Sequence, residues 1–121
     1  MQVENGKISK IAAPGTLSSS PSCKVFDGKS KLIMPGGVET HSHLQMPFMG
    51  TTSQDCFDTG TRANAAGGST FLLDFIVPKP GESLLKAYEQ WRNWADGKVH
   101  HDYGLHCCIT WWSDQVEKEM E

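Results

Sequence analysis

An α/β protein with a parallel sheet is the fold class that this sequence predicts. From residue 37 onward, strand patterns alternate with helix patterns, as is typical of parallel strands joined by helices. The segment 70–77 is an almost continuous apolar run that Pro78 ends, which indicates a strand buried on both faces. The segment 84–95 carries apolar residues at helical spacing, which predicts a helix with one buried face.

The remaining elements follow the same alternation along the chain. Small and polar residues separate the apolar segments and mark the turns between them. Three strand–helix units result, whereas a complete (β/α)₈ barrel has eight units in about 250 residues. The other expected elements are a strand over 38–43, a helix that Thr52 and Asp55 cap and Gly67–Gly68 end, a strand over 103–111 and a helix from 113 to 121.

The first 36 residues have a different character from the rest. Short strand patterns over 3–11 and 23–34 surround the turn dipeptides Asn5-Gly6 and Asp27-Gly28. Between them lies a loop rich in proline, glycine and serine. We therefore expect two regions, with residues 1–36 separate from residues 37–121.

Composition excludes several classes of function. The formal charge is −3, and no basic patch is present that would favour nucleic acid. No apolar run approaches the roughly 20 residues that cross a bilayer, and the N-terminus lacks the pattern of a secretion signal. The four cysteines form no Cys-x-x-Cys pair, which argues against a disulfide or structural zinc framework and favours a reducing, cytoplasmic location.

The segment 35–43 carries the strongest functional signal. It leaves a Pro-Gly-Gly turn and contains two histidines, His41 and His43, with one residue between them. Side chains at i and i+2 of a strand share one face, so both imidazoles can reach one metal ion. They lie toward the C-terminal end of the strand, where barrel active sites are found. The alternative is a pair of polar residues at a strand end that binds nothing.

Other candidate residues are weaker. Phe48 and Met49, just after the histidines, either wall a substrate pocket or pack within their loop. Strand parity directs His106 to the barrel interior, where a hydrogen-bonded core histidine is a better interpretation than a metal ligand. Asp74 lies mid-strand among apolar residues and is expected to form hydrogen bonds within the barrel. Two further histidines are expected at the surface, His100 and His101.

Together with Gly36, Gly37 and Glu39, the histidine segment resembles the first-strand signature of the amidohydrolase superfamily. Further segments, in their usual order, resemble the dihydropyrimidinase and hydantoinase family from about Val25 to the C-terminus. These segments are 45–50, 66–70, 73–75, 91–96, 102–106 and 111–114.

The resemblance implies the first three β/α units of a TIM-like (β/α)₈ metal-dependent hydrolase barrel, preceded by part of a small β-sandwich. It implies opening of dihydropyrimidine or hydantoin rings to N-carbamoyl amino acids, by a hydroxide that two divalent metal ions, taken as Zn²⁺, hold between them. It also implies a homotetramer for the complete protein. His41 and His43 would bind one ion, and later strands would supply a carboxylated lysine, two histidines and an aspartate.

Those later ligands have no counterpart in this sequence. None of the lysines after the motif, Lys79, Lys86, Lys98 and Lys118, falls at a strand end. No catalytic residue is therefore assigned within the chain, which is expected to be an N-terminal fragment, inactive alone.

Glu39 takes the place of the family's usual aspartate, as a residue behind the metal ligands. The alternative function is that of the non-catalytic, dihydropyrimidinase-related branch, whose members act in cytoskeletal signalling. That branch tends to lose the metal histidines, which this sequence retains.

Overall fold

The computed structural model describes all 121 residues, which form two units, Met1–Met34 and Pro35–Glu121. The first unit contains an antiparallel hairpin of β1 (Gln2–Glu4) and β2 (Lys7–Lys10). Asn5 and Gly6 between them both have positive φ, 51° and 74°, as a two-residue hairpin turn requires. The hairpin that the Asn-Gly dipeptide predicts is therefore confirmed.

The prediction of a second strand pair in this unit, around Asp27-Gly28, is wrong. The segment 23–34 contains no strand, and the Asp27–Gly28 dipeptide forms only a local turn. Its apolar side chains remain exposed, with Leu32 at 88% and Ile33 at 71%. Apolar residues alone do not make a strand when no neighbouring strand accepts their backbone hydrogen bonds.

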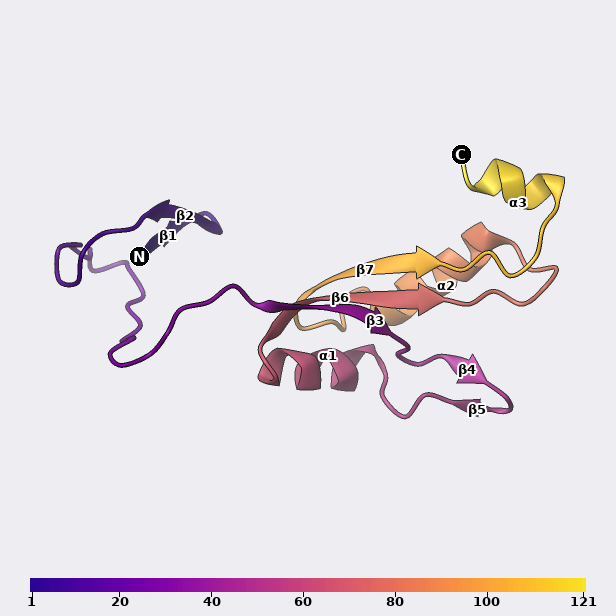
Figure 1. The fold of residues 1–121 in the computed structure, drawn as a ribbon, viewed down its shortest axis with the longest axis horizontal. Coiled ribbons are helices and arrows are strands. Elements are labelled where there is room, and N and C mark those ends of the chain that lie inside the picture. Colours follow the sequence, from indigo (N-terminus) through magenta and orange to yellow (C-terminus); the bar gives the residue numbers. More distant parts are fainter. The chain divides into compact units, whose positions relative to one another are not determined.

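The second unit contains a three-stranded parallel sheet in the order β3-β6-β7 (Figure 1). The alternation of strands and helices confirms the predicted α/β class. The elements are β3 (Gly37–Ser42), a small hairpin of β4 (Pro47–Phe48) and β5 (Thr51–Thr52), α1 (Phe57–Ala66), β6 (Ser69–Ile76), α2 (Leu84–Ala95), β7 (Asp102–Cys107) and α3 (Asp114–Glu119).

Two expected boundaries are corrected. Thr52 belongs to the β4–β5 hairpin, and α1 begins later, after Cys56, whose cap is completed by Thr59. The third strand ends at Cys107 instead of 111, because only one further backbone bond, from Cys108 to Ile76, extends the ladder. No helix of the chain has the length and apolarity needed to cross a bilayer.

One face of the sheet carries the core of this unit. Alternate side chains of β6, among them Leu72 and Ile76, are buried against the two longer helices. Phe57 of α1 and Trp91 of α2 pack on the same face, as the apolar stripe over 84–95 predicts. The β6 residues between them, such as Phe75, lie on the opposite face and remain half-buried.

The start of α2 is held by the last turn of α3. Ser83 and the backbone N–H of Leu84 donate to the two carboxylate oxygens of Glu119, at 2.8 and 2.6 Å. Gln115 donates to the same carboxylate at 2.8 Å. These side-chain hydrogen bonds hold the pKa of Glu119 below its usual range. Glu119 therefore supplies an acceptor that the free N–H groups of α2 need.

The close approach of β3 to β6 depends on glycine at position 36. A Cβ added to Gly36 would overlap the side chain of Thr70 at the start of β6. We expect Gly36→Ala to destabilise the second unit by about 1–3 kcal/mol, the usual range for overpacking. The measurement is chemical unfolding of the unaltered chain and of Gly36→Ala. Gly28→Ala is the control, because a Cβ at that position meets no atom within 4 Å; equal effects of the two changes would contradict the prediction.

Candidate metal-binding site

The two motif histidines lie at the end of β3 and share one face of the sheet. His41 is the penultimate residue of the strand and His43 follows its last residue. Their ring centroids are 4.9 Å apart, with the rings nearly perpendicular. The Nε2 atoms lie 3.1 Å from each other. The strand thus brings the two ring nitrogens within hydrogen-bond distance of each other on one face, as the His-x-His spacing predicts.

An irregularity in the β3–β6 ladder lies at His41, the first residue of this pair. Glu39 is paired with Leu72 and Ser42 with Asp74, so a three-residue step on β3 opposes a two-residue step on β6. The Glu39 carboxylate accepts a hydrogen bond from the backbone N–H of His41 at 3.0 Å. Glu39 therefore contacts the main chain of the first histidine, and it stabilises the backbone where the regular ladder is interrupted.

The spacing of the nitrogens fits a shared divalent ion. Zinc–nitrogen distances of about 2.0–2.1 Å at a tetrahedral angle place two ligand nitrogens about 3.3 Å apart. The observed 3.1 Å is within a few tenths of an ångström of that value. The donor set suits the ion as well, because imidazole is among the preferred ligands of zinc.

The chain brings no third ligand to this point. No group of three or more His, Cys, Asp or Glu side chains is close enough to hold a metal ion. His106 of β7 lies on the same face, but it is exposed and packs against Phe75, with 5.2 Å between ring centroids. The expectation of a buried, hydrogen-bonded His106 is therefore wrong, because its face of the sheet is open in this chain.

Asp74 forms a hydrogen bond within this unit, as expected from its place among apolar residues. It is fully buried on the helix side of β6, where its Oδ1 accepts the backbone N–H of Leu44 at 2.9 Å. Burial raises the pKa of Asp74 to about 6, while the N–H groups of Leu44 and Phe75 and the nearby Trp91 indole lower it. Neither Oδ2 of Asp74 nor Nε1 of Trp91 reaches a hydrogen-bond partner. The core of the unit thus contains a carboxyl group whose hydrogen bond to Leu44 holds the backbone beside the histidine pair.

Phe48 and Met49 occupy the tip of the β4–β5 hairpin. They are 57% and 90% exposed, and they line an open hollow of about 420 Å³ with residues such as Pro78 and Trp91. Trp91 lies on the helix side of the sheet, and neither motif histidine lines this hollow. The role of Phe48 and Met49 as pocket walls stays a prediction.

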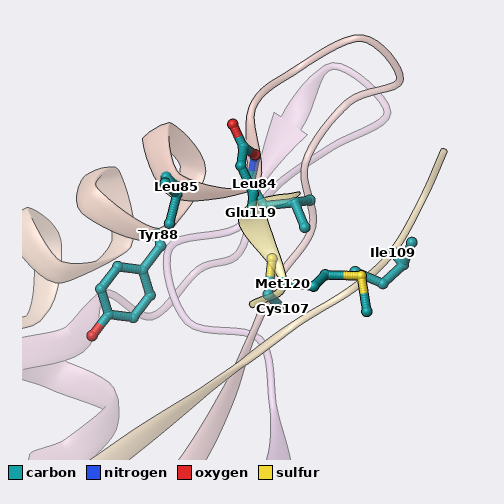
Figure 2. Close-up of a pocket in the computed structure, with 7 residues that line it drawn as sticks. All are labelled: Leu84, Leu85, Tyr88, Cys107, Ile109, Glu119 and Met120. Carbon is teal, nitrogen blue, oxygen red and sulfur yellow. The ribbon is translucent and has the colours of Figure 1, made fainter. Parts of the chain in front are cut away.

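A second hollow lies between α2, α3 and the end of β7 (Figure 2). Its walls are mostly apolar, and the Glu119 carboxylate beside Leu84 already accepts hydrogen bonds at the start of α2. No other carboxylate or imidazole lines it. The complete lining is Leu84, Leu85, Tyr88, Cys107, Ile109, Glu119 and Met120.

Of the two histidines expected at the surface, His100 is exposed, whereas His101 is not fully exposed. His100 lies 2.6 Å from the carboxylate of Asp58 on α1, and both side chains are more than 40% exposed. His101 is partly buried, and its Nδ1 donates to the carbonyl of Asp102. Neither histidine joins the candidate site.

Sequence analysis missed one residue of the site, Phe75 of β6. Its ring packs against both motif histidines, with centroids 4.3 Å from His41 and 5.6 Å from His43. Strand parity indicates only that Phe75 and Asp74 take opposite faces of β6. Which of them faces the histidines depends on where the helices pack, so the sequence pattern alone did not identify Phe75.

The chain is also similar to known proteins, both in sequence and in structure. No family model matches the sequence. A dihydropyrimidinase of Dictyostelium discoideum is 55% identical over 119 residues, which are 98% of this chain and 23% of that protein. The human dihydropyrimidinase-related protein 5 is 41% identical over 119 residues, 98% of this chain and 21% of that protein.

Solved structures give the same result. A D-hydantoinase (dihydropyrimidinase) from a Thermus species matches with a TM-score of 0.83 and 28% identity, over 87% of this chain and 23% of that one. The chain is therefore similar to the dihydropyrimidinase and hydantoinase family, and the resemblance carried by its motifs is confirmed. The chain spans about a quarter of the length of the curated relatives that it matches.

The buried carboxyl group of Asp74 predicts a pH dependence of stability. Its pKa is about 6 in the folded chain and about 3.9 when unfolded, so between these pH values the folded state binds more protons. The free energy of unfolding should fall by about 3 kcal/mol as pH rises through this interval.

Unfolding of the unaltered chain and of Asp74→Asn at pH 4 and pH 7.5 checks this prediction. The Asn variant should lose that part of the pH dependence, whereas Asp102→Asn, which removes an exposed carboxylate of the same sheet, should keep it. Identical pH profiles for the unaltered chain and Asp74→Asn would show that the buried carboxyl group is not responsible.

Proposed function

We propose that this chain provides the first metal-binding strand of a cyclic-amide hydrolase of the dihydropyrimidinase and hydantoinase type. The reaction is the opening of a dihydropyrimidine or hydantoin ring to an N-carbamoyl amino acid. The 3.1 Å separation of the His41 and His43 ring nitrogens carries the proposal, because it suits two ligands of one divalent ion. The 55% identity to a dihydropyrimidinase supports the choice of reaction.

The architecture proposed for the complete enzyme is a TIM-like (β/α)₈ barrel. Residues 37–121 would form its first three β/α units, and residues 1–36 would form part of a small β-sandwich. The parallel order of β3, β6 and β7, each followed by a helix, supports this assignment. A homotetramer is the proposed form of the complete protein, as the family resemblance implies. A cytoplasmic location is proposed because all four cysteines are free, which favours a reducing compartment.

His41 and His43 would hold one of two Zn²⁺ ions in the complete enzyme. A bound divalent ion polarises an amide carbonyl and lowers the pKa of water, the two difficulties of amide hydrolysis at neutral pH. The residues of this chain contribute binding and orientation. The two imidazoles supply lone pairs from one face of the sheet, and Glu39 fixes the main chain of the first one.

The second candidate function is that of a non-catalytic, dihydropyrimidinase-related protein. The 41% identity to the human dihydropyrimidinase-related protein 5 is the observation that supports this candidate. Metal binding distinguishes the hydrolase from the non-catalytic protein, because a protein without catalysis does not need two imidazoles held close together. Retention of both histidines, with their ring nitrogens 3.1 Å apart, favours the hydrolase.

We expect the 121-residue chain alone to bind zinc weakly and to show no hydrolysis. Catalytic zinc has three protein ligands, and the chain brings only two to the site. Zinc titration followed by NMR should shift the ring signals of His41 and His43, and His41→Ala should abolish the effect. His101→Ala is the matched control. Metal-dependent turnover of dihydrouracil or hydantoin by the monomeric chain, lost in His41→Ala, would contradict this expectation.

A chimeric enzyme tests the proposed activity directly. Residues 1–121 would replace the matching 119-residue segment of the Dictyostelium dihydropyrimidinase, and the product would be assayed with dihydrouracil and hydantoin. Activity should be retained, should be lost with His41→Ala or His43→Ala, and should survive His101→Ala. A folded chimera that stays inactive with zinc or cobalt would contradict the hydrolase assignment and favour the non-catalytic candidate.

A further inference from the structure

Two neighbouring residues of β6 contact the histidine segment from opposite faces of the sheet. Phe75 lies on the histidine side, where its ring packs against His41 at a centroid distance of 4.3 Å and an interplanar angle of 31°. The same ring lies 5.6 Å from that of His43. On its other flank, Phe75 contacts His106 of β7 at 5.2 Å. The ring therefore lies between the imidazoles of β3 and β7 on the open face of the sheet, where it limits how far the His41 and His43 rings can turn toward β6.

Asp74 acts on the backbone from the helix side. Its Oδ1 accepts the N–H of Leu44, the residue directly after His43, at 2.9 Å. The side chain of Asp74 is fully buried, so little space exists for it to change conformation. Leu44 is also buried and packs under α1, where Gly60 leaves room for its side chain. The main chain just beyond His43 is thus fixed by both a hydrogen bond and packing.

Regular strand pairing does not by itself fix the positions of His41 and His43. The β3–β6 ladder is interrupted between Glu39 and Ser42, where His41 lies. The last registered pair is Ser42 with Asp74, so His43 lies beyond the ladder. A pair of side chains at the end of an interrupted strand needs other contacts to keep its nitrogens 3.1 Å apart.

We propose that Phe75 and Asp74 are positioning residues for the metal-binding pair: Phe75 fixes the imidazole rings, and Asp74 fixes the backbone that carries them. The proposal rests on the metal site of the proposed function. Neither residue is a ligand, since Phe75 has no donor atom and Asp74 points to the other face of the sheet. Both act through the histidines, by reducing the reorganisation that metal binding requires.

Zinc affinity of matched variants provides the first test. Phe75→Leu removes the ring that contacts the imidazoles, and Phe71→Leu removes a ring from the same face of β6 that has no contact with them. Asp74→Ala removes the acceptor of the Leu44 N–H, whereas Asp74→Asn retains an oxygen at that position. We expect the first variant of each pair to weaken zinc binding about tenfold or more, and the second to bind nearly as the unaltered chain does.

Ring-to-ring nuclear Overhauser effects provide a second test that needs no metal, and its first measurement uses the unaltered chain. The unaltered chain should show contacts from the Phe75 ring protons to the imidazole protons of His41. In Phe75→Leu, contacts between the His41 and His43 rings should weaken while the fold, followed by backbone amide shifts, is retained. Absence of the Phe75–His41 contact in the unaltered chain would overturn the proposal even if a variant failed to fold.

The two hypotheses fail in different ways. If zinc binds the unaltered chain and His41→Ala abolishes binding, but Phe75→Leu and Asp74→Ala bind equally well, the positioning roles are wrong and the metal site stands. If zinc does not bind the unaltered chain differently from His41→Ala, the metal site is wrong in this chain. The Overhauser contacts then decide whether Phe75 nevertheless orders the histidine rings.

Discussion

The hydrogen bond from Leu44 to the buried carboxyl group of Asp74 is the interaction on which the site depends. It joins the segment after β3 to the central strand at a position where the ladder has already ended. Leu44 also fills the space that Gly60 leaves on α1, so one residue connects strand, sheet centre and helix. The segment that carries the histidines is therefore positioned from the core of the unit.

This arrangement has an energetic consequence for β6. A carboxyl group with a pKa near 6 is ionised at neutral pH in a position that disfavours charge, and one of its oxygens has no partner. The buried carboxyl group of Asp74 lowers the stability of the folded unit at one position, on the face of the sheet opposite the candidate metal site. Elsewhere on the same face, β6 uses the apolar side chains of Leu72 and Ile76.

The parts of the structure that sequence predicted are those that short-range patterns determine. The strand expected over 70–77 and the helix expected over 84–95 are both confirmed, because each pattern lies within a single element. The expectation that both faces of this strand are buried is wrong, because helices cover only one face of β6. The strand expected over 23–34 failed, since a strand needs a partner and apolar residues such as Leu32 found none. The capping residue of α1 was misplaced because Thr52 is equally suited to the hairpin strand it occupies.

The candidate site shows the same division between local and long-range information. The spacing of His41 and His43 is local, and the structure brings their nitrogens together as that spacing predicts. Which face Asp74 takes depends on where the helices pack, and the contact of Phe75 with the imidazoles depends on the register of β3 against β6. Both are long-range properties. Because Asp74 and Phe75 are adjacent in one strand, a single register determines both contacts, and a shift of one residue would exchange the faces on which they act. The register of β6 therefore links the stability of the helix side of the sheet to the geometry of the imidazoles on the other side.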